Sequence, residues 1–181
     1  MAIGSYDQTL DLASGRLALR PCAPADRARL HTIFRDPYVR RYLWDSKLVS
    51  LAMVDEVIAA SEACFGAHGM GLWCVAETGA RNAHETIGFA GLRPTSGPEF
   101  ELIYGFLPAH WGRGFARECA HALMADGFAR GLARIWAGTD LENKASERVM
   151  QRLGMRFDRR ETVGGLPQVW YVIEREAFRA A

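Results

Sequence analysis

The segment HWGRGFARE, residues 110–118, has the residue types of an anion-binding turn. It follows the apolar run ELIYGFLP and leads into CAHALMADGFARG, whose apolar residues recur at helical spacing. Gly112 and Gly114 permit a positive φ and a close backbone approach to a ligand. Arg113 and Arg117 add positive charge, and no acidic residue precedes Arg117 in the segment. The first N–H groups of a helix have no internal partner and carry partial positive charge, so the segment suits a phosphate or pyrophosphate. The competing interpretation is a plain tight turn.

Two common nucleotide motifs do not fit this segment, which we call the glycine segment. No Gly-Lys-Ser/Thr follows the glycines, which excludes a nucleotide P-loop. The glycines are also not spaced as G-x-G-x-x-G, and no acidic strand end lies where a dinucleotide fold would have one. Any anion held here is therefore bound in another way.

The elements that must position this segment form a β-α-α-β-β-β-α-β-α-β-β order. Strands are predicted for Arg16–Pro21, Leu72–Glu77, Thr86–Arg93, Phe100–Leu107 and Arg134–Thr139, followed by a final hairpin. Helices are predicted for Ala23–Arg35, Ser50–Phe65, Gly114–Arg130 and Asn143–Leu153, the last one capped by its asparagine. Residues 38–48 lack clean periodicity and are expected to form a loop. The order predicts an α/β domain with one mixed, mostly antiparallel sheet and helices on both faces.

Length and composition favour one domain without metal or disulfide support. The 181 residues are 49% hydrophobic and 24% charged, and residues 1–15 are expected to be a leader or an edge strand before a domain at 16–181. The net charge of +1 provides no global field for nucleic acid or an anionic membrane. The four cysteines form no CxxC pair and the five histidines show no ligand spacing, so no metal is expected. No secretory leader or membrane span is recognisable, which predicts a cytoplasmic protein.

The glycine segment with its flanks, FELIYGFLPAHWGRGFAREC, resembles the acyl-CoA-binding motif of the GCN5-related N-acetyltransferases (GNAT). That motif reads Gln/Arg-x-x-Gly-x-Gly/Ala ahead of a long helix, with Trp111, Gly114 and Ala116 at its first, fourth and sixth positions here. The tryptophan departs from Gln/Arg, but P-x-x-W-G-x-G-x-A is similar to the RimJ/RimL branch, which acetylates ribosomal-protein N-termini. A later block, NKASERVMQRLGMRF, resembles the family's Asn-x-x-Ser/Ala…Leu-Gly-Phe segment. The similarity runs from about Leu17 to Glu174.

This resemblance implies acetyl-CoA as the acyl donor, and no metal. In the family, acetyl-CoA lies in a V-shaped gap between two parallel strands, which here are Phe100–Leu107 and Arg134–Thr139. The pantetheine arm is expected to pair with backbone groups near Phe106 and Leu107. The pyrophosphate is expected on the backbone amides of Trp111, Gly112, Arg113, Gly114, Phe115 and Ala116.

The resemblance also implies a direct transfer to an amine, which must lose a proton to attack. Glu101 is the first candidate base because it lies on the strand beside the expected thioester; Glu99 is a weaker rival, and a solvated carboxylate paired with arginine is the alternative. Many family members protonate the leaving thiolate with a tyrosine four residues before the Gly of the later block. Met150 stands there and cannot donate, so Ser146 is the expected replacement. Asn143 is expected to cap its helix and to bond the pantetheine arm.

The acceptor is expected to be a protein N-terminal amine or a small-molecule amine. Tyr42, Trp44, Trp73 and Tyr104 are candidates to line its pocket, although each is also a reasonable core residue. The chain is expected to be a monomer or a homodimer. The alternative function is a non-catalytic acyl-CoA-binding or sensing module on the same fold.

Overall fold

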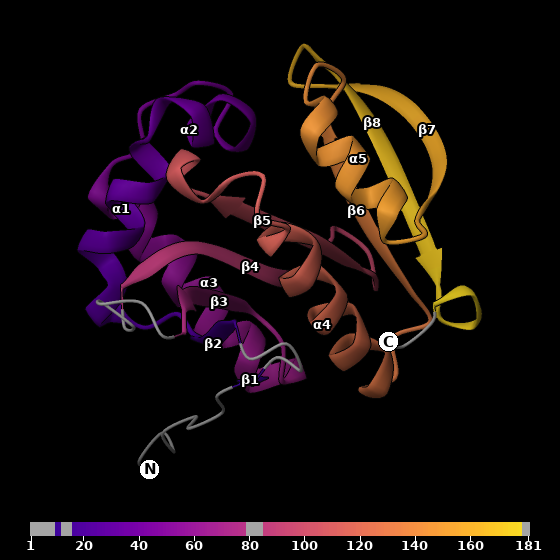
Figure 1. The fold of residues 1–181 in the computed structure, drawn as a ribbon, viewed down its shortest axis with the longest axis horizontal. Coiled ribbons are helices and arrows are strands. Elements are labelled where there is room, and N and C mark those ends of the chain that lie inside the picture. The colour runs from indigo at the N-terminus through magenta and orange to yellow at the C-terminus, as the bar shows by residue number, and fades with distance from the viewer. Residues whose placement is uncertain (1–9, 12–15, 79–84, 179–181) are drawn as a thin grey trace.

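The computed structural model describes residues 10–11, 16–78 and 85–178, which contain one eight-stranded sheet. The strand order is β1-β2-β3-β4-β5-β6-β8-β7, and every neighbouring pair is antiparallel except β5 and β6 (Figure 1). The strands are β1 (Leu10–Asp11), β2 (Leu17–Pro21), β3 (Leu72–Glu77), β4 (Thr86–Pro94), β5 (Phe100–Phe106), β6 (Arg134–Asp140), β7 (Arg156–Val163) and β8 (Leu166–Glu174).

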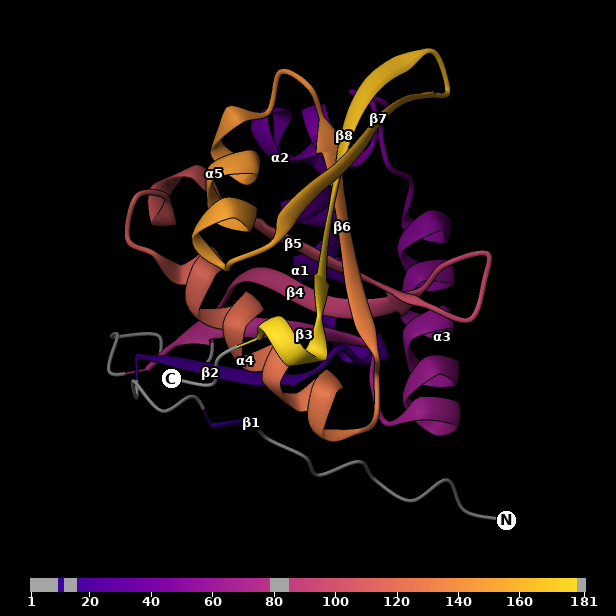
Figure 2. The same cartoon turned by 90° about the vertical axis from the view of Figure 1, so that its right-hand side faces the viewer.

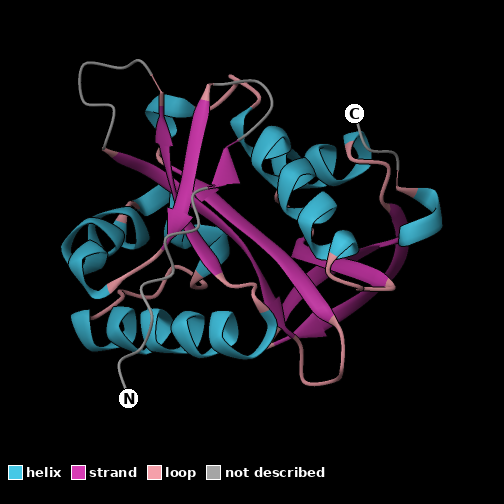
Figure 3. Ribbon diagram, turned by 90° about the horizontal axis from the view of Figure 1, so that it is seen from below, coloured by secondary structure: helices cyan, strands magenta, loops and turns pink. Residues whose placement is uncertain are grey.

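Helices cover both faces of this sheet, as Figures 2 and 3 show. One face carries α4 (Phe115–Ala129) and α5 (Lys144–Arg152). The other face carries α1 (Arg27–Arg35), α2 (Pro37–Leu43) and α3 (Leu51–His68). Three short 3-10 turns lie at Pro24–Asp26, Pro108–His110 and Arg175–Ala177. This arrangement confirms the α/β class, the mixed and mostly antiparallel sheet, and the helices on both faces.

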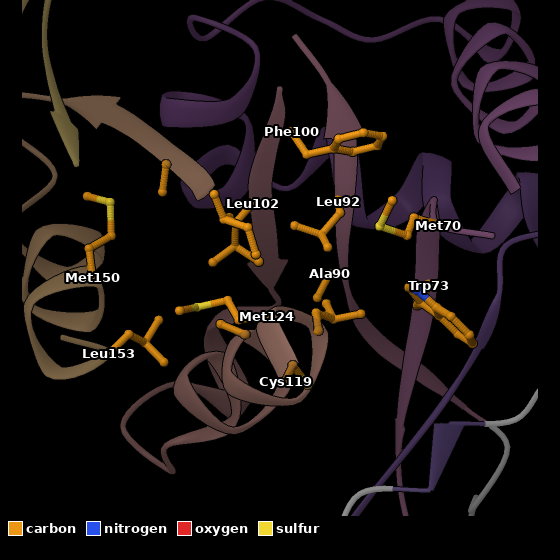
Figure 4. Close-up of a cluster of buried hydrophobic side chains, with 14 of the residues drawn as sticks. Met70, Trp73, Ala90, Leu92, Phe100, Leu102, Cys119, Met124, Met150 and Leu153 are labelled. Atoms are coloured by element: carbon orange, nitrogen blue, oxygen red, sulfur yellow. The ribbon is translucent and has the colours of Figure 1, made fainter. Parts of the chain in front are cut away.

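Two hydrophobic cores follow from the alternation of side chains along the central strands. Leu102 packs with Met124 and Met150 on the face of α4 and α5, where Figure 4 shows them (the first core). Ile103, one residue later on β5, packs instead with the core beneath α1, α2 and α3. Successive side chains of a strand point to opposite faces. Glu101 therefore shares the face of Ile103, while Tyr104 shares the face of Leu102. These two polar side chains of β5 thus lie on opposite faces of the sheet.

The helix α2 corrects the expectation of a loop over residues 38–48. Asp36 Oδ1 accepts hydrogen bonds from the backbone N–H groups of Tyr38 and Val39, at 2.9 and 3.2 Å. Pro37 occupies the first helical position, where its missing N–H is no loss. The Asp-Pro pair therefore ends α1 and also begins α2. A helix of 7 residues is too short to display helical periodicity, so the cap was the readable signal.

The capping residues predicted for α3 and α5 are found at the starts of these helices. Ser50 Oγ caps α3 by accepting from the Met53 N–H at 3.2 Å. The helix continues past its predicted end at Phe65 to His68, and Gly69 ends it with φ of +67°. Asn143 Oδ1 caps α5 through the Ser146 N–H at 3.2 Å. At the edge of the sheet, the backbone of Leu10–Asp11 pairs with β2. The other residues of the expected N-terminal leader lie outside the described ranges.

Candidate active site

A cavity of about 1050 Å³ opens where β5 and β6 separate. Their parallel pairing is confined to Phe100 with Ile135 and Glu101 with Trp136, although both strands continue beyond these residues. The cavity is lined by β5, β6, α5, α2, the glycine segment and the β7–β8 hairpin. It is large enough for an extended small molecule rather than a single ion.

The backbone of β5 offers hydrogen-bonding groups to this gap. The Leu107 N–H donates to the Ile87 carbonyl at 3.1 Å, on the β4 side. Antiparallel pairing alternates along a strand, so the backbone groups of Phe106, Tyr104 and Leu102 turn toward the gap. The Phe106 carbonyl there accepts from Trp111 Nε1 at 2.6 Å. Of the two residues expected near the pantetheine arm, Phe106 thus faces the gap and Leu107 directs its N–H to β4.

The glycine segment forms the turn that begins α4 at one end of the cavity. Gly112 and Gly114 have φ values of +73° and +82°, and Gly114 is the N-cap of α4 without a side-chain cap. A Cβ at Gly112 would meet nothing within 4 Å, so the backbone conformation, not crowding, favours glycine there. The first helical bond is that of the Glu118 N–H to the Gly114 carbonyl at 3.1 Å. The preceding N–H groups of the first turn are therefore free of helical partners, as an anion site requires.

An acidic residue from β3 lies at the mouth of this turn. Glu77 accepts two hydrogen bonds from Arg113, one of 2.8 Å between Oε2 and Nη1. The hydrogen bonds from Arg113 hold the pKa of the Glu77 carboxyl below its usual range. The Arg113 guanidinium also lies 4.5 Å from the centre of the Phe115 ring. Arg113 is thus neutralised locally, whereas Arg117 lines the cavity. Sequence reasoning missed Glu77 because it lies 36 residues from Arg113.

Replacing Glu77 tests whether Arg113 contributes to anion binding. Glu77→Gln is expected to tighten coenzyme A binding about two- to fivefold at low salt, because an exposed ion pair of modest strength no longer holds Arg113. The gain should vanish at high ionic strength, where surface charges are screened. Titration calorimetry at two salt concentrations measures both effects. Asp126→Asn, which removes the ion pair with Arg130 at the other end of α4, is the matched control. Equal or weaker binding by Glu77→Gln at low salt would contradict a role for Arg113.

The candidate base Glu101 is buried and lines the cavity at the last paired position of β5 and β6. Its Oε2 accepts from Arg93 Nε at 2.9 Å and lies 2.8 Å from Arg93 Nη2. The rival Glu99 accepts from Trp136 Nε1 at 2.6 Å and is not part of the cavity wall. The partner Arg93 comes from β4, so its pairing with Glu101 follows from strand register rather than from any local motif.

On the sheet face that carries α4 and α5, the gap brings together two hydroxyl groups. Tyr104 Oη lies 2.8 Å from Ser146 Oγ and 3.3 Å from the Ser146 carbonyl oxygen. Burial raises the pKa of Tyr104 to about 12. Asn143, which caps the same helix, also donates from Nδ2 to Thr139 Oγ1 at 2.9 Å, so both ends of its amide are engaged. Met150 is buried in the first core, where it supplies no hydrogen-bond donor.

The four aromatic residues expected in the acceptor pocket occupy different environments. Tyr42 lines the cavity from α2, with the Arg41 guanidinium 5.0 Å from its ring centre, and Tyr104 lines it from β5. Trp73 lies two strands from the gap, packed edge-on against Phe65 in the first core.

Trp44 packs against Phe34 at 5.5 Å between ring centres and is also absent from the cavity wall. Trp73 and Trp44 are therefore packing residues, because large apolar side chains on these elements fill the two cores. Gly138 and Trp170 are better wall residues: a Cβ at Gly138 would lie 2.9 Å from the Trp170 ring, so the glycine lets the indole lie across β6. Only the pairing of β6 with β8 reveals this contact.

Neither a metal site nor a membrane-spanning helix is found in the described ranges. They contain no group of three or more His, Cys, Asp or Glu side chains arranged to hold a metal ion. None of their helices combines the length and the apolar character needed to cross a membrane.

The chain is similar to known acetyltransferases. Residues 16–156 match the family model described as acetyltransferase (GNAT) domain. The Bacillus subtilis protein named uncharacterized protein YkkB is 31% identical over 153 residues, covering 82% of this chain and 86% of that protein. The B. subtilis uncharacterized N-acetyltransferase YoaA is 28% identical over 146 residues, covering 80% and 82%. The structure of RimL, a ribosomal L7/L12 α-N-protein acetyltransferase in complex with coenzyme A, has a TM-score of 0.78 and 16% identity, covering 94% and 99%.

Proposed function

The chain belongs to the GNAT acetyltransferase family, and from this premise we propose that it moves the acetyl group of acetyl-CoA to a primary amine by direct attack in a ternary complex. The observation that carries the proposal is the separation of β5 from β6, which opens a cavity between the start of α4 and a buried carboxylate. Membership of the family identifies acetyl-CoA as the acyl donor. The identity of the acceptor amine and the role of each site residue are proposed below.

The backbone around the glycine segment would hold the coenzyme. We assign the diphosphate to the amides of residues 111–116, where the turn and the dipole of α4 favour negative charge. The pantetheine arm would run along β5 past Phe106 and Leu107, with Asn143 near its inner end. The Phe106 carbonyl already accepts from Trp111 Nε1, so the arm would share this oxygen with the indole or displace it.

Glu101 would accept the proton of the attacking amine. Its carboxylate lies at the inner end of the gap, on the sheet face that carries α1, α2 and α3. The amine nitrogen forms a bond to the acetyl carbon, the carbon–sulfur bond breaks, and the sulfur keeps the electron pair. A backbone N–H of β5 would stabilise the oxyanion, and Ser146 would give the leaving sulfur a hydrogen bond. Tyr42 and Tyr104 would contact the acceptor or the acetyl group from the cavity wall.

The acceptor is proposed to be a protein N-terminal amine or a small-molecule amine. The P-x-x-W-G-x-G-x-A pattern supports the ribosomal-protein N-acetyltransferase branch. Residues 16–178 supply every element of the proposed site, so we assign the catalytic domain to 16–181. The cytoplasm, which acetyl-CoA and ribosomal proteins share, is the proposed compartment, and the chain is proposed to act as a monomer or homodimer.

Turnover of acetyl-CoA tests the proposed function. Thiol release is followed with a chromogenic disulfide against a panel of peptide N-termini and small amines. At least one amine is expected to accelerate release well above the rate with acetyl-CoA alone. Tight binding of acetyl-CoA without thiol release on any amine would instead support an acyl-CoA sensor on the same fold.

A further inference from the structure

Tyr104 and Ser146 form a hydroxyl pair that bridges β5 and α5 inside the cavity. Their oxygen atoms are 2.8 Å apart, and both residues line the cavity wall. The two residues are 42 positions apart in the sequence, so the pair exists only because α5 packs on the sheet. One turn further along α5, Met150 presents a thioether and no donor.

The surroundings of the pair restrict which hydroxyl can donate. Tyr104 Oη has two acceptors within reach, the Oγ and the carbonyl oxygen of Ser146, at 2.8 and 3.3 Å. When Tyr104 donates over the shorter distance, to Ser146 Oγ, the serine hydrogen is not used between the two hydroxyls and can turn into the cavity. Burial keeps Tyr104 protonated, since its pKa is about 12, so its hydroxyl is a donor throughout the usual assay range.

We propose that Tyr104 is a positioning residue that donates to Ser146, so that the Ser146 hydroxyl is directed at the sulfur leaving acetyl-CoA. This inference rests on the proposed function and identifies how the thiolate is stabilised. As the carbon–sulfur bond breaks, the sulfur gains the electron pair and accepts the Ser146 hydrogen bond. Neither hydroxyl loses its proton. The proton released by the amine passes to Glu101, which balances the step, and reaches the thiolate or solvent afterwards.

The test compares Tyr104→Phe, Ser146→Ala and the double variant in steady-state kinetics. Ser146→Ala is expected to lower kcat about 100-fold, as loss of a donor to developing charge does. Tyr104→Phe is expected to lower kcat about tenfold, because a hydrogen bond that orients the donor is lost. The double variant should match Ser146→Ala, since Tyr104→Phe keeps the ring and removes only the hydroxyl, which acts through the serine. The KM for acetyl-CoA should stay within about twofold, because the pair acts on the leaving group rather than on binding. Ser146→Thr, which keeps a hydroxyl, should recover part of the activity.

Tyr171→Phe is a matched control for α5 docking. Tyr171 also bridges the sheet to α5, accepting from Gln151 Nε2 and donating to Glu147 Oε1, each at 3.0 Å, but it does not line the cavity. Its replacement should lower the melting temperature about as much as Tyr104→Phe and leave kcat unchanged.

Two kinetic outcomes would overturn the inference. One is a kcat for Tyr104→Phe equal to that of Tyr171→Phe; the other is additive losses in the double variant. Absence of turnover by the wild-type protein on every amine would overturn the proposed function itself, and the inference with it.

Discussion

Gly114→Glu is expected to weaken coenzyme A binding at least about 100-fold. Gly114 has φ of +82° at the start of α4, where a side chain costs on the order of 1–2 kcal/mol of strain. The larger effect is electrostatic, because a carboxylate would stand where the amides of the first turn are proposed to hold a diphosphate. Titration calorimetry with coenzyme A measures the dissociation constant directly.

Gly131→Glu is the matched control for this prediction. Gly131 follows the other end of α4, has φ of +105°, and like Gly114 has space for an added Cβ. It should lose comparable thermal stability and bind coenzyme A as the wild-type protein does. Gly114→Ala, which introduces strain without charge, should fall between the two. An unchanged affinity in Gly114→Glu would remove the diphosphate from this turn.

Glu101→Gln is expected to lower kcat about 10²- to 10³-fold while coenzyme A affinity changes less than about twofold. The amide keeps the shape of the side chain but cannot accept the amine proton. The pH profile of kcat/KM should also change, because the acidic limb that reports the essential base disappears. Steady-state kinetics over pH 5–9, combined with calorimetry, separate the effect on chemistry from the effect on binding.

Glu99→Gln is the control for the base assignment. Glu99 lies two residues before Glu101, but its carboxylate accepts from Trp136 Nε1 and is not part of the cavity wall. Its replacement should leave the pH profile intact. A wild-type profile in Glu101→Gln, or loss of the acidic limb in Glu99→Gln, would move the base to another residue.

The parts of the site that depend on local chemistry were predicted from the sequence. Glycines with positive φ ahead of α4 and the Asn143 cap of α5 are short-range features, and each is found where its residues predicted it. The parallel β5–β6 neighbours followed from the β-α-β order and the family resemblance. The order of the elements along the chain, the mixed sheet and its two helical faces were thus predicted from pattern and motif, whereas the place of β8 between β6 and β7 was not.

Contacts between distant segments were not predictable in this way. Glu77 reaches Arg113 from β3, and Tyr104 reaches Ser146 across the gap, because packing and register bring these residues together. The same reasoning explains Trp73, whose aromatic character suited either a pocket or a core and whose place on β3 decides for the core. The helix α2 was missed because a short helix reveals itself by its Asp36 cap rather than by periodicity.

A crystal structure with bound coenzyme A would show whether the start of α4 holds the diphosphate. We expect the diphosphate on the backbone amides of residues 111–116, the pantetheine arm between β5 and β6, and the sulfur between Glu101 and the hydroxyl of Ser146. Coenzyme A bound away from the glycine segment, or with its thiol directed out of the gap, would rule out the proposed site.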